Sequence, residues 1–390
     1  MIPWGRVGFP PRRGKPGPDP SKTVEKKPVP LDFERADLER EVAALGAKPF
    51  HGRQVFRWLW RKGTSEFDQM TDLGRELRAE LAGHFSDAAP VVESRQTSAD
   101  GTTKFLIRLA DGRHIESVYI PDTPAQTFCV STQVGCAMAC AFCLTGKMGL
   151  VRHLTAGEIA GQVRALAHET GLANSAFNIV LMGMGEPLHN YDATMKALRI
   201  LADEEGLAVP PRRVTLSTVG LVPAIEKLAS EPLMPNLAIS LHATTEEQRS
   251  QIVPINRKYS LEDLIAACKR LPVGKRRRIT FEYVLLEGVN DTPADARRLV
   301  RLLDGIKAKV NLLPLNEAPG IAFTRPSDDR VNAFARILAD RGVIVSVRRS
   351  RGRDIRAACG QLIVEGERSS AAQRLGKQMG TGSFSTDSGS

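Results

Sequence analysis

Short apolar segments alternate with amphipathic segments from Gln126 to about Leu362. The apolar segments have the length and composition of β-strands: Thr127–Ser131, Asn178–Met182, Val214–Ser217, Leu237–Leu241, Ile279–Leu285, Val310–Pro314 and Val343–Val347. Apolar residues at three- and four-residue spacing predict helices over Ala156–Glu169, Thr194–Asp203, Leu261–Leu271, Pro293–Leu303 and Asp328–Asp340. Repeated strand–helix units over residues 122–363 predict an α/β fold with a parallel sheet closed fully or partly into a barrel. Function is then expected at the carboxyl ends of the strands.

The pattern is different at both ends of the chain. In residues 31–88 the apolar positions, such as Leu38 and Val42, recur at helical spacing and predict a small helical domain. Residues 1–30 are rich in Pro, Gly, Lys and Arg, which predicts a disordered basic tail. Residues 364–390 are expected to be a second flexible tail.

A β-hairpin is predicted between the helical domain and the strand–helix units. Residues 89–121 contain two alternating segments around Asp111-Gly112, which favours a two-residue turn. Glu116 shares a strand face with Val118 and Ile120. If that face is buried, the Glu116 carboxylate points inward, where it requires a partner or a function.

Positive charge is abundant and clustered. The chain has 390 residues and a formal net charge of +10, which is typical of proteins with a polyanionic partner such as nucleic acid. Lys275–Arg278 is one basic run and Arg348–Arg356 contains another. Arg53, Arg57 and Arg61 recur every four residues, on one face of a predicted helix. These clusters suit contacts with phosphates.

The sequence gives no sign of export or of membrane insertion. No apolar run reaches the roughly 18 residues of a membrane-spanning helix, and the N-terminus lacks the apolar region of a secretory signal. We therefore expect a cytoplasmic protein, where thiols stay reduced and structural disulfides are rare. We expect a monomer.

Three of the six cysteines lie within eight residues, as Cys136-Ala-Met-Ala-Cys140-Ala-Phe-Cys143, directly after the first predicted barrel strand. Structural zinc requires four ligands; Cys129 lies in a strand, and no second Cys or His pair with suitable spacing is present. A cubane cluster can take three thiolates from one loop and leave its fourth iron open. The spacing therefore predicts one 4Fe-4S cluster on Cys136, Cys140 and Cys143.

The Cys-x3-Cys-x2-Cys spacing, with Phe142 before the third cysteine, resembles the cluster loop of radical S-adenosylmethionine (SAM) enzymes. This resemblance implies a partial (β/α)6-type radical SAM barrel. It also implies that the open iron binds the amino and carboxylate groups of SAM. Reductive cleavage of SAM then yields a 5′-deoxyadenosyl radical.

A second segment agrees with SAM binding. Met182-Gly-Met-Gly-Glu-Pro187 resembles the glycine–glutamate segment that contacts the SAM amino group in this superfamily, which assigns that contact to Gly185 and Glu186. A plain strand–helix turn is the alternative reading. Other polar positions at predicted strand ends could complete a cofactor-binding rim: Ser217, Ser240-Leu241-His242 and Asn316. For His242 a structural, packed histidine is the alternative.

Several motifs together, in the same order, closely resemble the RlmN family, from about Leu31 to about Leu362. They are Glu116-Ser-Val-Tyr-Ile-Pro121, Phe128-Cys-Val-Ser-Thr-Gln-Val-Gly-Cys136, Gly183-Met-Gly-Glu-Pro187, Ser240-Leu-His242 and Ala358-Cys-Gly-Gln-Leu362. Members of this family are radical SAM enzymes that methylate C2 of adenosine in the peptidyl transferase centre of 23S rRNA and beside the anticodon in tRNA. The resemblance implies both RNAs as partners and an electron donor such as flavodoxin.

The resemblance also implies a role for each further cysteine and for Glu116. A thiol matching Cys359 takes a methyl group from one SAM, and a second SAM supplies the radical, so that two SAM are consumed per turnover. The activated methyl group adds to adenine C2 and joins the RNA to the protein. Glu116 is the proton acceptor, and Cys129 resolves the adduct through a transient disulfide with Cys359. Cys268 is expected to be a buried helix thiol.

Three alternatives stay open at this point. A related Cfr-type enzyme, which methylates C8 of the same rRNA adenosine, shares the cysteine set. A radical SAM enzyme acting on protein would leave Cys359 and the arginine clusters without a role. A non-catalytic iron–sulfur or zinc RNA-binding module would not require SAM.

Overall fold

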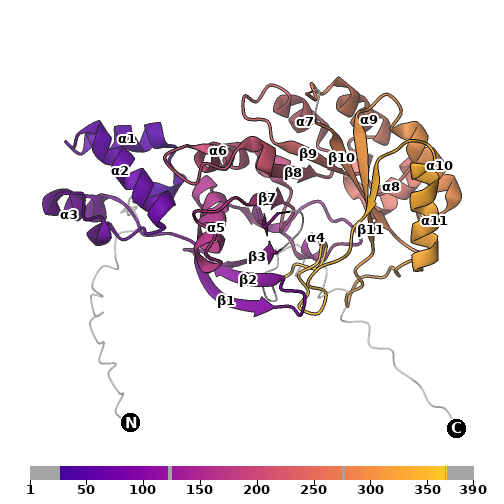
Figure 1. Cartoon of the computed structure of the whole chain (residues 1–390), viewed down its shortest axis with the longest axis horizontal. Coiled ribbons are helices and arrows are strands. Elements are labelled where there is room, and N and C mark those ends of the chain that lie inside the picture. The colour runs from indigo at the N-terminus through magenta and orange to yellow at the C-terminus, as the bar shows by residue number, and fades with distance from the viewer. Residues whose placement is uncertain (1–26, 122–124, 275–276, 365, 367–390) are drawn as a thin grey trace, which may run out of the picture.

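One ten-stranded sheet organises the computed structural model, which describes residues 27–121, 125–274, 277–364 and 366 (Figure 1). The strand order is β1-β2-β3-β4-β7-β8-β9-β10-β11-β12. Strands β1 to β4 pair antiparallel, and every pair from β4 to β12 is parallel. The strands are β1 Val91–Thr97, β2 Thr103–Arg108, β3 His114–Ile120, β4 Thr127–Cys129, β7 Asn178–Leu181, β8 Val214–Thr218, β9 Asn236–Ser240, β10 Ile279–Leu285, β11 Ala308–Pro314 and β12 Val345–Val347.

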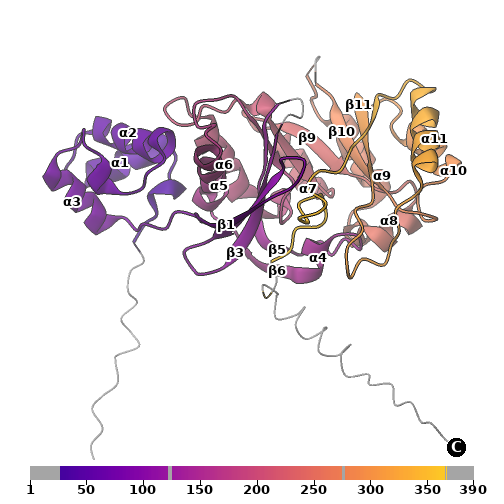
Figure 2. The ribbon, with the colours of Figure 1, turned by 60° about the horizontal axis from the view of Figure 1, so that its bottom comes forward.

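Helices connect the parallel strands and pack on the outer side of the curved sheet (Figure 2). They are α5 Ala156–Glu169, α6 Tyr191–Ala202, α7 Val222–Leu228, α8 Glu246–Ile252, α9 Leu261–Arg270, α10 Pro293–Leu302 and α11 Asp328–Ala339. The short helix α4 Leu144–Met148 instead directly follows Cys143. Helix α5 begins with a capping box, because Thr155 Oγ1 accepts from Glu158 N and the Glu158 carboxylate accepts from Thr155 N. The predicted α/β partial barrel is confirmed.

The predicted hairpin is also present, but it continues the barrel sheet. Strands β2 and β3 pair around the Asp111-Gly112 turn, and Val118 of β3 then pairs with Cys129 of β4. An additional strand, β1, extends the hairpin. Glu116 therefore lies on a strand next to the first barrel strand.

A second, two-stranded sheet was not expected from the sequence. Strand β4 ends at Cys129, and the chain forms β5 Gln133–Cys136, which pairs antiparallel with β6 Gly149–His153. Strands β5 and β6 enclose the segment that carries Cys140 and Cys143. The cysteine segment is therefore the tip of a hairpin. The sequence placed it directly after the first barrel strand, whereas β5 lies between that strand and the segment.

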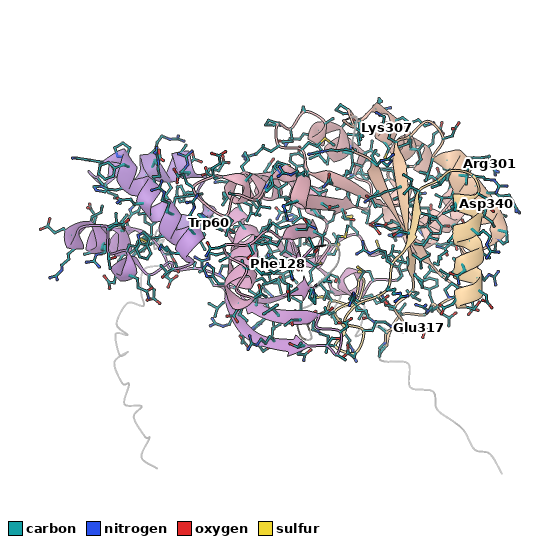
Figure 3. All side chains as sticks on the ribbon, in the orientation of Figure 1. Trp60, Phe128, Arg301, Lys307, Glu317 and Asp340 are labelled. Atoms are coloured by element: carbon teal, nitrogen blue, oxygen red, sulfur yellow. The ribbon has the colours of Figure 1, made fainter. Side chains whose placement is uncertain are left out.

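The region before β1 is helical, in agreement with the sequence pattern. Helices α1 Arg35–Ala44, α2 Pro49–Arg57 and α3 Arg75–His84 form it, and α2 continues as a π-helical turn over Trp58–Lys62. Its interior is apolar: Leu38, Val42, Val55, Phe56, Leu59 and Trp60 are fully buried. Trp60 lies on the side facing the barrel, and Phe128 lies within the barrel part (Figure 3).

The arginines of α2 do not form the open basic face that the sequence suggested. Arg57 Nε lies 2.6 Å from Glu205 Oε2, and Arg61 Nε donates to Gly206 O at 3.2 Å. Arg53 contacts Glu39. Arg57 and Arg61 thus join the helical region to the segment after α6. Their guanidinium groups already have partners within the protein.

Several sequence predictions lie outside the described residues. They are residues 1–26 of the first tail, Lys275 and Arg276 of the basic run, and 365 and 367–390 of the second tail. Within the described part of the chain, no helix is long and apolar enough to cross a membrane.

Candidate active site

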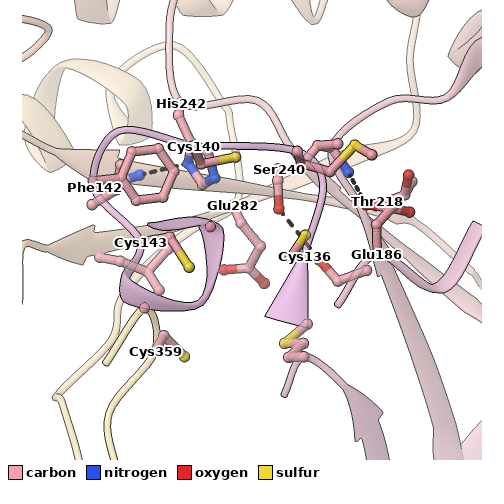
Figure 4. Close-up of a pocket in the computed structure, with 18 of the residues that line it drawn as sticks. Cys136, Cys140, Phe142, Cys143, Glu186, Thr218, Ser240, His242, Glu282 and Cys359 are labelled. Atoms are coloured by element: carbon pink, nitrogen blue, oxygen red, sulfur yellow. Dashed lines mark hydrogen bonds between the residues drawn. The ribbon is translucent and has the colours of Figure 1, made fainter. Parts of the chain in front are cut away.

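One cavity at the carboxyl ends of the barrel strands contains the three clustered cysteines (Figure 4). Cys136 ends β5, and Cys143 directly precedes α4. Cys136 and Cys140 are buried and Cys143 is half-buried. The segment between them is fixed to the barrel, because Ala141 N donates to Ile252 O at 2.9 Å. The predicted ligands are thus brought together on one anchored hairpin.

The thiol arrangement fits an iron–sulfur cluster. Burial raises the pKa of Cys136 to about 12 and raises that of Cys140 well above its usual value, and their neighbouring cysteines add to both shifts. Thiolates this close require a compensating cation, which a metal centre provides. Within the described residues, no three metal-binding side chains converge on one point, as a single zinc ion would need. Three sulfurs spaced around a shared cavity suit a multi-iron centre better.

Arg249 is a buried cation behind the cysteine hairpin that the sequence did not single out. This α8 residue is fully buried and donates to Leu241 O, Val219 O and Asn256 Oδ1 at 3.2, 2.6 and 2.9 Å. It fixes the chain just after the ends of β8 and β9. Burial lowers its pKa to about 10, while its electrostatic attraction to Cys140 opposes that shift.

Glu186 and Gly185 lie on the cavity wall after β7, where a SAM contact is expected. The Glu186 carboxylate accepts from Leu188 N at 3.0 Å and from Val219 N at 2.9 Å. Burial raises its pKa to about 7, although these hydrogen bonds oppose the shift. Gly185 has φ +107°, and a Cβ there would lie 2.7 Å from Gln133. Gly185 is therefore required at least for packing against β5.

The other predicted rim residues also surround this cavity, except Leu241, whose buried side chain points into the core. Ser217 and Ser240 place their hydroxyls 3.4 Å apart across β8 and β9. His242 adopts φ +58°, accepts from Val284 N at Nδ1, and packs edge-on against Phe142. Burial lowers the His242 pKa to about 3, so its ring is neutral. A structural role for His242 is evident, alongside its place on the cavity wall.

Cys359 reaches the cavity from a segment that is neither helix nor strand. Its side chain is exposed, but the surface it exposes faces the cavity, and the surrounding protein raises its pKa while Arg348 opposes the shift. Asn316 Nδ2 donates to Cys359 O at 3.3 Å, and Asn316 Oδ1 is buried with no hydrogen-bond partner among the described residues. Leu144 N donates to Gly360 O at 2.8 Å. The segment is thus docked against the cysteine hairpin.

Cys129 lies close to Cys359 but outside the cavity lining. It is buried at the end of β4 and is a free thiol, as is Cys359. The two thiols are within electrostatic reach, because Cys359 adds to the rise in the Cys129 pKa that burial causes.

Glu116 contacts the same C-terminal segment. Its side chain is buried; Oε2 accepts from Ile363 N at 2.9 Å, and Oε1 lies 2.8 Å from Lys104 Nζ. Burial raises the Glu116 pKa, and Lys104 opposes the rise. Glu116 does not line the cavity with Cys359, and its inward direction is confirmed.

Three residues near Cys359 were missed: Glu282 lines the cavity, and Asn311 and Ser346 support it through hydrogen bonds. Arg348, expected from the sequence as part of a basic cluster, also lines the cavity. The sequence signal for Glu282 is a charged residue inside the apolar predicted strand Ile279–Leu285. Such a residue on a barrel strand is a useful signal, because buried carboxylates need partners or a function.

Comparison with known proteins agrees with this arrangement. Residues 130–301 match the model of the radical SAM superfamily, and residues 31–86 match the ribosomal RNA large subunit methyltransferase N-terminal domain. The chain is 48% identical over 335 residues to the dual-specificity RNA methyltransferase RlmN of Syntrophobacter fumaroxidans, covering 86% of this chain and 97% of that protein. It is 50% identical over 328 residues to RlmN of Geobacter sulfurreducens, covering 84% and 89%.

A solved structure matches as well. The crystal structure of a radical SAM methyltransferase from Sphaerobacter thermophilus aligns with a TM-score of 0.83 and 49% identity, over 86% of this chain and 99% of that one. The match includes most of the described residues. The resemblance drawn from the sequence motifs is confirmed.

Proposed function

Because the chain belongs to the RlmN family of radical SAM RNA methyltransferases, we propose that it methylates C2 of adenosine in 23S rRNA and beside the anticodon in tRNA. The observation that carries this proposal is the position of Cys359. It lines the same cavity as Cys136, Cys140 and Cys143, with Cys129 in electrostatic reach. A radical SAM enzyme that transfers no methyl group through the protein would not need a fourth thiol in the cavity of the cluster cysteines.

The cluster cysteines and the rim residues would hold the cofactors. When bound, a 4Fe-4S cluster and SAM supply an electron and a carbon-centred radical, with a reductant such as flavodoxin as the electron source. Glu186, Ser217, Ser240 and Asn316 offer acceptors and donors to SAM, in line with their place on the cavity wall. The unpartnered Asn316 Oδ1 is the clearest sign of an absent donor.

Cys359 would act as the methyl carrier. Its thiolate attacks the methyl group of one SAM, so that a C–S bond forms at Cys359 as the sulfonium C–S bond breaks and S-adenosylhomocysteine leaves. The carried methyl group would then give one hydrogen atom to the carbon radical derived from a second SAM, which leaves as 5′-deoxyadenosine, and the resulting methylene carbon bonds to adenine C2. This sequence consumes two SAM for each methyl group transferred.

Glu116 and Cys129 would complete the turnover. Glu116 takes the proton from C2, and burial, which raises its pKa, makes it a stronger base for this step. The adduct would give up one electron to an acceptor such as the oxidised electron carrier. The Cys129 thiolate then attacks the Cys359 sulfur, and the disulfide forms as the product carbon leaves that sulfur and takes up a proton to become the methyl group. Because Glu116 bonds Ile363 N in the present arrangement, the C-terminal segment would have to shift for both steps.

The RNA would bind near the cavity mouth. The arginine-rich segment that carries Arg348, Arg349, Arg351 and Arg353 adjoins Cys359 and would contact phosphates. The target base would be extruded into the cavity, where the chemistry requires it. The α2 arginines contribute less than the sequence suggested, since Glu205 and Glu39 pair with two of them.

Nucleoside analysis of cellular RNA tests this proposal. Mass spectrometry of digested rRNA and tRNA from cells with and without the protein should show 2-methyladenosine only where the protein is present. Finding 8-methyladenosine instead would favour the Cfr-type alternative. No change in either nucleoside would refute the proposed activity.

A further inference from the structure

Glu282 is a buried carboxylate at the Cys359 end of the cavity. The residue is 7% exposed and lies on β10, whose other side chains are apolar except for Thr280 and Tyr283. Figure 4 shows its carboxylate among Cys136, Cys143 and Cys359. A buried carboxylate that faces a cavity points to a ligand with hydrogen-bond donors.

One hydrogen bond reaches the Glu282 carboxylate from the described residues. Asn311 Nδ2 donates to Oε1 at 2.8 Å, and Ser346 Oγ donates to Asn311 Oδ1 at 3.4 Å, which fixes the direction of the Asn311 amide. Within the described residues no hydrogen bond to Oε2 is found, and Glu282 lines the cavity. Burial raises the Glu282 pKa, whereas Arg348 and Lys309 favour the ionised form.

The cavity thus has two buried carboxylates with different surroundings. Glu186 has both oxygens bonded to backbone N–H groups and acts electrostatically on Cys136 and Cys140. Glu282 has one oxygen bonded and acts electrostatically on Cys359. Glu282 therefore belongs to the part of the cavity where the methyl carrier meets its substrate.

We propose that Glu282 recognises the target base, its free oxygen accepting a hydrogen bond from the exocyclic amine of the adenine beside Cys359. This inference rests on the proposed RNA methylation. Adenine presents an amine donor at the position where guanine presents a carbonyl acceptor, so a fixed acceptor selects adenine. SAM carries the same amine, and Ser240, an expected SAM contact, pairs with Glu282 across the strands. The experiment must therefore separate the two adenines.

Replacing the carboxylate by an amide reverses the polarity of this contact. Asn311 Nδ2 still needs an acceptor, so in Glu282→Gln the amide oxygen faces Asn311 and the amide nitrogen faces the cavity. A donor then meets the adenine donor. Because a hydrogen bond to a charged group is lost, RNA with adenosine at the target position should bind and react about 10- to 100-fold less well.

The test uses cluster-loaded protein and two stem-loop RNAs, which differ by adenosine or purine riboside at the target position. Purine riboside lacks the amine. We expect the wild type to prefer the adenosine RNA, and Glu282→Gln to lose this preference while its affinity for the purine riboside RNA and for SAM stays within about twofold. Binding is measured by fluorescence anisotropy for RNA and by equilibrium dialysis for SAM, with initial methylation rates beside them.

The control is Glu247→Gln, an exposed glutamate on α8, which should behave as wild type. Equal losses with both RNAs, or no preference in the wild type, would overturn the proposal. A loss of SAM affinity with unchanged RNA affinity would assign Glu282 to the SAM adenine and also overturn it. Unchanged iron content and thermal melting exclude misfolding. If the wild type binds but never methylates the adenosine RNA, the proposed function fails, while the binding preference still tests Glu282.

Discussion

The two ends of the active-site cavity are built in different ways. At the cluster end, three cysteines lie on a hairpin that continues from β4 and is tied to the barrel through backbone hydrogen bonds, such as Thr132 N to Met184 O. At the other end, Cys359 lies on a segment without regular structure. That segment is held by a backbone hydrogen bond from Leu144 N to Gly360 O and by side chains distant in sequence, including Asn316 and Glu116.

The difference corresponds to different demands on the two ends. Cluster ligands must keep a constant geometry, which strands and buried backbone bonds supply. In the proposed reaction the Cys359 sulfur meets SAM, the RNA base and Cys129 in succession. A segment held by a few exchangeable side-chain contacts can move between such partners, as loops that carry function commonly do.

The largest expected effect is the loss of RNA methylation, and its cause should differ between the two ends of the cavity. Cys140→Ala and Cys359→Ala should each lower RNA methylation by more than about 1,000-fold, since each removes a group required for chemistry. Only Cys140→Ala should also lose the cluster absorbance and SAM cleavage. Iron analysis, visible spectra and 5′-deoxyadenosine formation measure this, with Cys268→Ala as the buried-thiol control. Methylation by Cys359→Ala would contradict the carrier role.

Cys129→Ala should affect a later step than Cys359→Ala. Transfer to the RNA can begin, but no thiol resolves the link to Cys359, so a protein–RNA adduct accumulates and turnover stops after about one cycle. Denaturing gels with labelled RNA detect the adduct. The double variant with Cys359→Ala serves as the control, because it has no carrier thiol. Free product at wild-type yield would rule out Cys129 as the resolving thiol.

Lys104→Met should change the pH dependence of RNA methylation, which involves the Cys359 end, but not that of SAM cleavage at the cluster end. The Lys104 ammonium lowers the Glu116 pKa, so its removal raises that pKa further. Because the base must be ionised, the acid limb of the methylation rate should move to higher pH, while the rate above the new pKa recovers. SAM cleavage without RNA should keep its profile. Lys307→Met, at an exposed lysine, is the control, and an unmoved acid limb would argue against Glu116 as the base.

Asp354→Ala should have the smallest effect. Asp354 accepts from Ser98 Oγ at 2.6 Å and ties the arginine-rich segment to the loop between β1 and β2. Its loss should speed hydrogen exchange in residues 352–364 and lower the methylation rate about two- to fivefold, without changing iron content. Asp340→Ala, at the exposed end of α11, is the control. Unchanged exchange in both variants would mean that other contacts hold the segment.

The fold and the cluster end were predictable because their signals are local. Strand and helix periods placed β10 and α5 within the observed bounds, and three cysteines in eight residues need no tertiary information. The hairpin β5–β6 was missed since its strands are short and half of it is Gly-rich or polar. Pairing partners for such strands are set by the tertiary structure.

The features that the sequence did not predict depend on contacts between residues far apart in sequence. Arg57 and Arg61 read as a free basic face because their partners, residues 204–206, lie on another element. Glu282 sits in a seven-residue strand whose two faces are both buried, so alternation could not show which face meets the cavity. Family resemblance supplied roles for Cys129, Cys359 and Glu116, which composition and spacing alone did not.

The late position of the Cys359 segment in the chain has a consequence for biogenesis. Residues 352–364 follow every strand of the sheet, so a ribosome synthesises the cysteine hairpin and all barrel strands before the segment that docks on them through Gly360. Until then the cavity lacks one wall. The order of synthesis thus places Cys359 after the cluster cysteines and after the rim residues that share its cavity.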